Sequence, residues 1–236
     1  MRAPWDVLEP ASQGEIERDK RAIARVERFS GAIFALSMAL LVLNLVVPQV
    51  EGQPTDLAVQ GALVQMIPIF LTFVLSFALL ATAWMLHHFQ FNYLVRTGGE
   101  ILWINGALMF FVILVPFSTG LASAYAATRT AVVLYELNIL AIQALLLLSW
   151  RRALKTGLLF GGNVSFAIVR RMRLALTAGT AYVLASIPFT WMSPWLSLGL
   201  LAGLAAFYIF LTARGGYTLD AFRQRQAPPT ETPWPL

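Results

Sequence analysis

The chain has 236 residues, of which 58% are apolar and 12% are charged, and its formal net charge is +5. Soluble domains carry about 25% charged residues, so this composition excludes an ordinary soluble domain and favours a membrane protein. Cysteine is absent, which excludes disulfides, thiolate metal sites and a cysteine nucleophile.

Apolar segments long enough to cross a bilayer recur along the chain. A membrane-spanning helix needs roughly 20 such residues. Six segments meet that length, near 29–48, 63–86, 101–121, 131–150, 174–192 and 195–213. A membrane β-barrel would alternate apolar and polar residues, whereas the segment 140–150 is almost continuously apolar. The sequence therefore predicts an all-α integral membrane protein with six transmembrane helices.

Lysine and arginine are distributed unevenly between the connections of these helices. Sixteen of the 17 fall in the N-terminal arm, the second and fourth connections and the C-terminal tail, and only Arg129 falls on the opposite side. Because positive residues are retained on the cytoplasmic side, we expect both termini to face the cytoplasm. The same asymmetry accounts for the basic net charge, so no nucleic-acid partner is expected.

Three regions follow from these patterns. We predict a cytoplasmic N-terminal arm at 1–27, a six-helix transmembrane domain at 28–214 and a cytoplasmic tail at 215–236. The tail ends in a proline-rich run, a composition typical of an extended, partly disordered segment.

The first predicted helix carries three different stripes. Residues seven apart share a helix face, which makes a polar line of Ser30, Ser37 and Asn44. An apolar ridge lies roughly a quarter-turn away and consists of Leu36, Leu40 and Leu43. The far side has small residues, namely Ala32, Ala35 and Ala39. Small faces let helices approach closely, so we expect this helix to pack inside protein instead of against lipid. Taken alone, the leucine ridge is more typical of ordinary packing.

Two adjacent histidines, His87 and His88, end the second predicted helix. Neighbouring residues on a helix point about 100° apart, so the pair does not face one metal ion as residues four apart would. We therefore expect no metal site here. A polar cluster is the favoured interpretation, with imidazole bonded to Ser30 or Asn105.

Glu136 is the only carboxylate well inside a predicted span. Ionisable groups in the membrane are costly and often mark an ion or proton path, which makes Glu136 a candidate ion-path acid. A structural role is the favoured alternative, in which the side chain snorkels or faces a water-filled vestibule near the outer end of its helix. Three prolines, Pro68, Pro116 and Pro188, are expected to start or kink helices.

Short motifs follow one another in a fixed order over residues 25–150. They are Arg25-x-x-x-Phe29-Ser30, Trp84-x-x-His87-His88, Asn105, Pro116-Phe117-Ser118-Thr119 and Tyr135 with Asn138. In this order and spacing the chain resembles the transmembrane protein 175 family, the potassium channels of lysosomes and their bacterial relatives. The resemblance implies a first-helix motif supported by a network of His, Trp and Asn side chains. In that family an Asp completes the motif and the network, but Gly31 stands in its place here and leaves the network rebuilt or weaker.

The resemblance also implies a pore lined by the first helix of each subunit. Leu36 matches the family's constricting Ile or Leu, with Leu40 and Leu43 one and two turns outward. Ala39 stands where many relatives have Thr, and Asn44 where many have an acid. A hydroxyl can coordinate a cation and an acid can concentrate one, so these departures leave the strength of potassium selectivity open.

By this resemblance the chain is a potassium-preferring cation channel subunit, assembled as a homotetramer in a bilayer and conducting monovalent cations passively without a cofactor. The expected location is the bacterial inner membrane. The alternative is a secondary transporter or proton-coupled carrier that uses Glu136 with His87 and His88, although no internal repeat supports it. Neither a nucleotide-binding nor a nucleophile motif indicates an enzyme.

Overall fold

A computed structural model describes residues 13–50, 52–53, 55–96, 98–156 and 166–214. Over these residues all regular structure is helical. The elements are α1 (Gln13–Leu40), η1 (Leu41–Asn44), α2 (Asp56–Gln65), α3 (Ile67–Asn92), α4 (Gly99–Ala124), α5 (Arg129–Lys155), α6 (Phe166–Ser186), η2 (Ile187–Trp191) and α7 (Pro194–Arg214). Six helical segments are long and apolar enough to cross a membrane. The prediction of an all-α protein with six transmembrane helices is confirmed.

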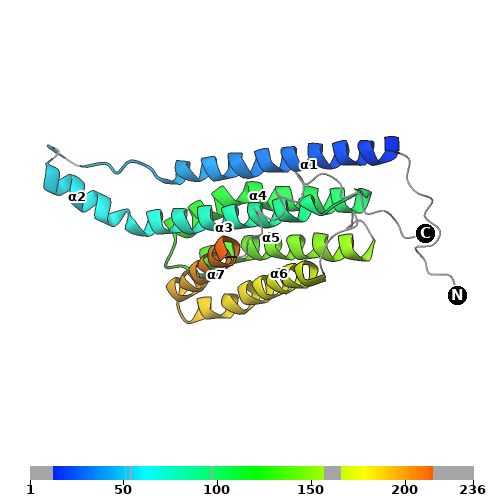
Figure 1. The fold of residues 1–236 in the computed structure, drawn as a ribbon. Helices are drawn as coiled ribbons and strands as arrows, with labels where there is room; N and C mark the ends of the chain where they lie inside the picture. Colours follow the sequence, from blue (N-terminus) through cyan, green and yellow to red (C-terminus); the bar gives the residue numbers. More distant parts are fainter. Residues whose placement is uncertain (1–12, 51, 54, 97, 157–165, 215–236) are drawn as a thin grey trace, which may run out of the picture.

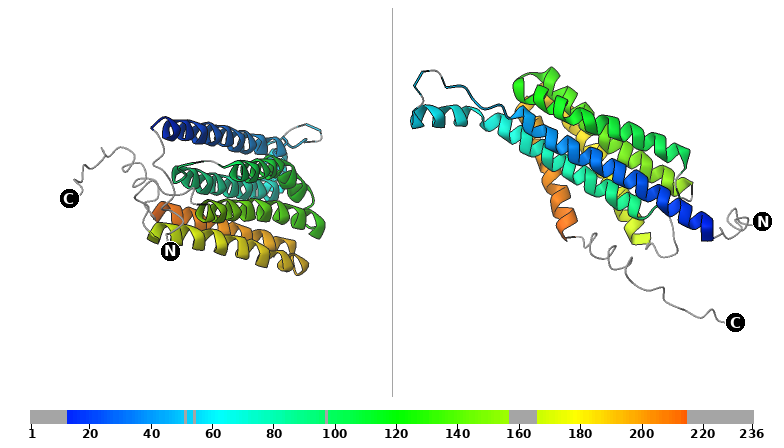
Figure 2. Two further views of the ribbon diagram at one scale, coloured as in Figure 1. Left: turned by 90° about the vertical axis from the view of Figure 1, so that its right-hand side faces the viewer. Right: turned by 90° about the horizontal axis from the view of Figure 1, so that it is seen from above.

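The helices form layers, with α1 on one outer side of the bundle. α1 packs on α3 and α4, which in turn pack on α5, while α6 and α7 cover the opposite side (Figure 1). The left view of Figure 2 shows the same order of layers, and the right view shows α2 projecting beyond the bundle as an extension of α3. One apolar core runs through all the layers and includes Phe34 of α1, Val112 of α4 and Trp150 of α5.

Prolines set several helix boundaries, as expected. Pro68 lies in the first turn of α3, after a break at Met66 that separates α2 from α3. Pro188 lies in the first turn of η2, where α6 ends. Both positions suit proline, because the first turn of a helix does not use its N–H groups. Pro116 instead lies inside α4.

Two helices begin earlier than the apolar runs predict. α1 begins at Gln13 and crosses the predicted boundary between residues 27 and 28 without a break, because its polar first half also packs on the bundle through the buried Ile23. α6 begins at Phe166, so Arg170, Arg171 and Arg173 lie on a helix and not in a connection. Residues 1–12 and the predicted tail at 215–236 lie outside the described residues.

Ion pairs between helices gather at one end of the bundle. His88 of α3 pairs with Glu27 of α1 (Nδ1–Oε1 2.8 Å), and Arg96 pairs with Asp19 of α1 (Nε–Oδ2 2.8 Å). The first turn of α4 joins the last turn of α5 through Glu100 Oε1 and Arg152 Nη1, 2.6 Å apart. We call this the charged end. It carries the residues for which a cytoplasmic location is predicted from the charge asymmetry.

Candidate functional site

The polar line of α1 faces the inside of the protein. Ser30 and Ser37 are buried, and Ser30 joins a network with α3 and α4. Asn105 Nδ2 donates to Ser30 Oγ at 3.0 Å, and Asn105 Oδ1 lies 2.9 Å from His87 Nε2. Because an amide oxygen only accepts, this contact requires the proton of the imidazole on Nε2. The predicted bond between His87 and Asn105 is therefore present.

The two histidines belong to different environments. His87 is buried and stacks on Phe91 with ring centroids 4.3 Å apart, whereas His88 stacks on Trp84 at 5.8 Å and pairs with Glu27. They diverge as neighbours on a helix must. Within the described ranges, no group of three or more His, Cys, Asp or Glu residues could hold a metal ion.

Gly31 lies beside this second environment. With Trp84 and both histidines it lines a pocket of about 330 Å³, and a Cβ added to Gly31 would lie 3.9 Å from Trp84 Nε1. That distance is an ordinary van der Waals contact, so the position has space for a side chain. The motif aspartate of the family is missing here, but the indole N–H that could donate to it is in place.

Asn44 turns back into the protein where α1 ends. Its Nδ2 donates at 3.0 Å to the carbonyl oxygen of Pro116, the proline inside α4. The approach is so close that a Cβ on Gly120 would lie 2.6 Å from Asn44 Oδ1. Sequence reasoning missed this role for Gly120, because its partner is distant in the chain and no local pattern marks it.

A second buried network joins α3, α4 and α5, and it links Ser76 of α3 to residues quoted for the family resemblance. Thr119 donates to Ser76 Oγ at 2.8 Å, and Ser76 Oγ lies 2.9 Å from the hydroxyl of Tyr135. Asn138 donates to Ser118 Oγ at 3.0 Å. These bonds hold together the helices against which α1 packs.

The leucine ridge of α1 lies on the face turned away from α3 and α4. Leu36 is 59% exposed, and Leu40 and Leu43 are exposed as well. The small residues Ala32, Ala35 and Ala39 are also uncovered. The expectation that α1 packs inside protein is therefore met on only one side, because none of the residues that the structure describes covers this second face.

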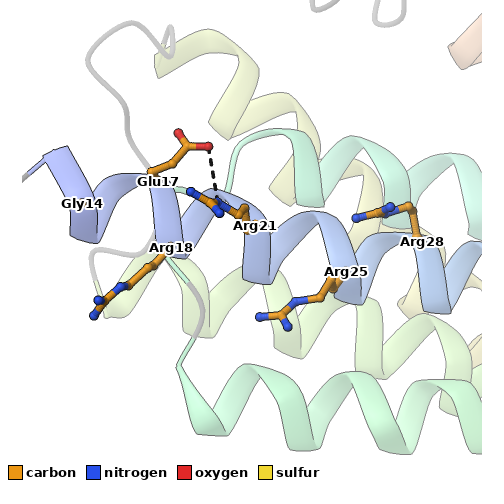
Figure 3. A pocket seen from close by; sticks show the side chains of 6 residues that line it. All are labelled: Gly14, Glu17, Arg18, Arg21, Arg25 and Arg28. Atoms are coloured by element: carbon orange, nitrogen blue, oxygen red, sulfur yellow. Dashed lines mark ion pairs between the residues drawn. The ribbon is translucent and has the colours of Figure 1, made fainter.

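The exposed face continues toward the charged end as a row of arginines. Arg18, Arg21, Arg25 and Arg28 line a shallow groove of about 800 Å³ together with Glu17 (Figure 3). Arg21 Nε lies 3.6 Å from Glu17 Oε1, and Arg28 Nε donates to Ala24 O at 3.0 Å. At 100° per residue Arg25 lies about 20° from the direction of Leu36. The motif arginine and Phe29, which is exposed too, thus share the face of the leucine ridge.

Glu136 lies in another part of the molecule, between α5, α6, η2 and α7. It is fully buried, and its carboxylate accepts from Ser186 Oγ at 2.9 Å, from Thr190 Oγ1 at 2.6 Å and from Ser197 Oγ. The predicted snorkelling is wrong, because the side chain bends into the protein to reach three hydroxyl groups. Its network is separate from that of His87, which joins α1, α3 and α4.

Comparisons with known proteins agree with this arrangement. Residues 25–116 match the family model described as the endosomal/lysosomal potassium channel TMEM175. A potassium channel of Chamaesiphon minutus is 30% identical over 187 residues, which cover 78% of this chain and 92% of the relative. A potassium channel of Streptomyces collinus is 28% identical, with 79% and 91% covered.

A solved structure is similar as well. The crystal structure of a lysosomal potassium-selective channel TMEM175 homolog from Chamaesiphon minutus superposes with a TM-score of 0.71 at 28% identity. The match covers 80% of this chain and 97% of that one. The order of helices and the motif residues agree with this similarity, which extends over nearly the whole length of these relatives. The chain belongs to the TMEM175 family.

Proposed function

We propose that the chain is one subunit of a homotetrameric, potassium-preferring cation channel whose pore is lined by α1. The single observation that carries the proposal is the division of α1 into a buried polar face and an exposed leucine face. One copy of α1 cannot enclose a pore. In the proposed channel, the exposed faces of α1 from several subunits therefore surround a common axis. The relatives named as potassium channels support potassium as the permeant ion.

In this proposal Leu36 forms the narrowest ring, with Leu40 and Leu43 in the next layers. Leucine rings resist wetting and make an ion lose hydration without offering oxygen atoms in return. Ala39 adds no hydroxyl, and the amide of Asn44 bonds Pro116. We therefore expect a preference for potassium that is modest, with the hydrophobic constriction acting as filter and gate.

The proposal also places the charged end in the cytoplasm of a bacterium, with the channel in the inner membrane. The absence of cysteine makes the chain suitable for single-cysteine labelling. A cysteine at Thr156 is expected to react only from the cytoplasmic side and one at Gln53 only from outside. Labelling of Thr156→Cys by an impermeant reagent in intact cells would contradict this orientation.

Reconstitution tests the function itself. We expect purified protein in liposomes to carry potassium flux, and in planar bilayers to give unitary currents. We expect native mass spectrometry to give the mass of four 26.1 kDa chains. Saturable flux linked to protons and lost in Glu136→Gln would instead support the carrier. A monomer with full activity would rule out the shared pore.

A further inference from the structure

A groove lies between the end of α5 and the start of α6, at the charged end of the bundle. Its volume is about 610 Å³. The lining residues are Arg151, Leu154, Lys155, Arg173, Leu174 and Thr177. It is far from the leucine ridge in the fold, because α5 and α6 lie on the other side of α3 and α4 from α1 (Figure 1).

Three cations from two helices meet in this groove. Arg151, Lys155 and Arg173 are exposed, and among the residues that the structure describes no carboxylate forms an ion pair with them. Their neighbour Arg152 differs, because it pairs with Glu100. Like charges held close together repel one another, so an anion in the groove would relieve this repulsion.

Along α6 the groove changes from cationic to apolar in the direction of the membrane. The exposed Leu174 follows Arg173, and Thr177 lies one turn further into the apolar part of α6. The long aliphatic parts of arginine and lysine side chains also suit an interface, because they reach past apolar surface to place a charge at the headgroup level. A phospholipid has the same order, with a phosphate outside and acyl chains inside.

We propose that this groove binds the headgroup of an anionic phospholipid. The phosphate lies between Arg151, Lys155 and Arg173, and the first part of an acyl chain lies against Leu174. Guanidinium groups bind phosphate oxygens through two parallel hydrogen bonds, and basic pockets between membrane helices are suited to such headgroups. The proposal needs only the membrane-spanning fold and does not depend on ion conduction.

Native mass spectrometry of the purified oligomer in neutral detergent tests the site. The probes are phosphatidylglycerol and, as the zwitterionic control, phosphatidylcholine. The groove variant is Arg151→Gln with Arg173→Gln. Its matched control is Arg170→Gln with Arg171→Gln, which removes the same charge from exposed positions near the start of α6 that do not line the groove.

We expect the groove variant to bind phosphatidylglycerol about tenfold more weakly or worse, since each basic side chain contributes appreciably to anionic lipid binding. The control variant is expected to remain within about twofold of the unmodified protein. Phosphatidylcholine is expected to bind equally to all three. The single change Arg173→Gln, expected to have an intermediate effect, serves if the double variant fails to assemble.

Two results would overturn the proposal. Equal loss of phosphatidylglycerol from the groove and control variants would mean that only the general positive charge attracts lipid. Displacement of the lipid by an equal concentration of inorganic phosphate would mean that the groove is a site for free phosphate. Either result would leave the proposed channel function untouched, because the flux measurement does not involve this groove.

Discussion

On the side of α1 that meets α3 and α4, Ser30, Phe34 and Ser37 are buried, and Ser30 is tied to Asn105. On the opposite side Leu36 and Leu40 are exposed, and the arginines of the first half continue the same face. A helix at a lipid boundary is expected to hide its polar residues and show apolar ones. The arginines precede the apolar part of α1, at the charged end, where they suit an aqueous entrance. In the proposed channel, one face of α1 therefore serves the fold of the chain itself and the other serves the assembly.

The largest effect is expected from changing the exposed face at its proposed narrowest point. Leu36→Asn adds polar atoms that admit hydrated ions, so we expect unitary conductance to rise severalfold and the preference for potassium over sodium to fall. Planar bilayer recordings measure both quantities.

Leu184→Asn is the matched control, because Leu184 of α6 is also a leucine with 59% exposure and lies in the outer layer opposite α1. Its conductance is expected to remain unchanged. An intact Leu36→Asn oligomer with the conductance of the unmodified channel would contradict the proposed role of the exposed face.

The buried face is expected to respond in stability instead of conduction. Asn105→Leu removes the partner of both Ser30 and His87 and leaves their polar groups buried, at a cost of about 1–3 kcal/mol. Interhelical hydrogen bonds in membranes are weaker on average, about 0.6 kcal/mol, so the lower end of that range is expected. Thermal unfolding in detergent measures the change.

Ser123→Ala is the control on the same helix. Its hydroxyl donates to the carbonyl oxygen of Gly120 within the same helix, so we expect the loss of this group to change stability little. An Asn105→Leu protein as stable as Ser123→Ala would mean that the network does not fix α1.

A gain of stability is expected at Gly31. Gly31→Ala alone gains about 0.5–1 kcal/mol from helix propensity. Gly31→Asp is expected to be more stable than Gly31→Ala by about 1 kcal/mol, because its carboxylate reaches the indole N–H of Trp84. Comparison of the three thermal unfolding curves separates the two contributions.

The same pair of substitutions in a Trp84→Phe background provides the control. There the advantage of Asp over Ala is expected to disappear. Glu27 lines the same pocket, and a Gly31→Asp protein less stable than Gly31→Ala would show that repulsion from Glu27 outweighs the new hydrogen bond.

The smallest effect is expected at the arginines. If Arg25 surrounds the cytoplasmic entrance in four copies, its positive charge lowers the local concentration of cations. Arg25→Gln is then expected to raise the current that enters from that side, by less than about twofold near 0.15 M salt and by more at low salt, where screening is weaker. A current ratio that is independent of salt would place Arg25 away from the ion path.

The parts of the structure that depend on local pattern were predictable from the sequence. Continuous apolar runs gave the six spans, and the seven-residue repeat of Ser30 and Ser37 identified the face of α1 that is buried. The hydrogen bond between His87 and Asn105 was one of two alternatives that followed from their places at the same end of adjacent helices.

Contacts between distant helices were not predictable in the same way. The hydroxyl partners of Glu136 lie 50 to 61 residues further along the chain, and an isolated Ser or Thr in an apolar span has many possible roles. Asn44 stands where many relatives have an acid, but in this structure its side chain donates to the carbonyl oxygen of Pro116. In both cases a contact between elements distant in the chain determines the role, and the pattern within one helix does not predict it.

The most direct test is to place a cysteine on each of the two matched leucines, since the chain has none of its own. If α1 lines the pore, Cd²⁺ or a positively charged thiol reagent is expected to block the potassium current of Leu36→Cys and to leave that of Leu184→Cys unchanged. Full current through an intact Leu36→Cys oligomer after treatment, or block of Leu184→Cys alone, would contradict the account.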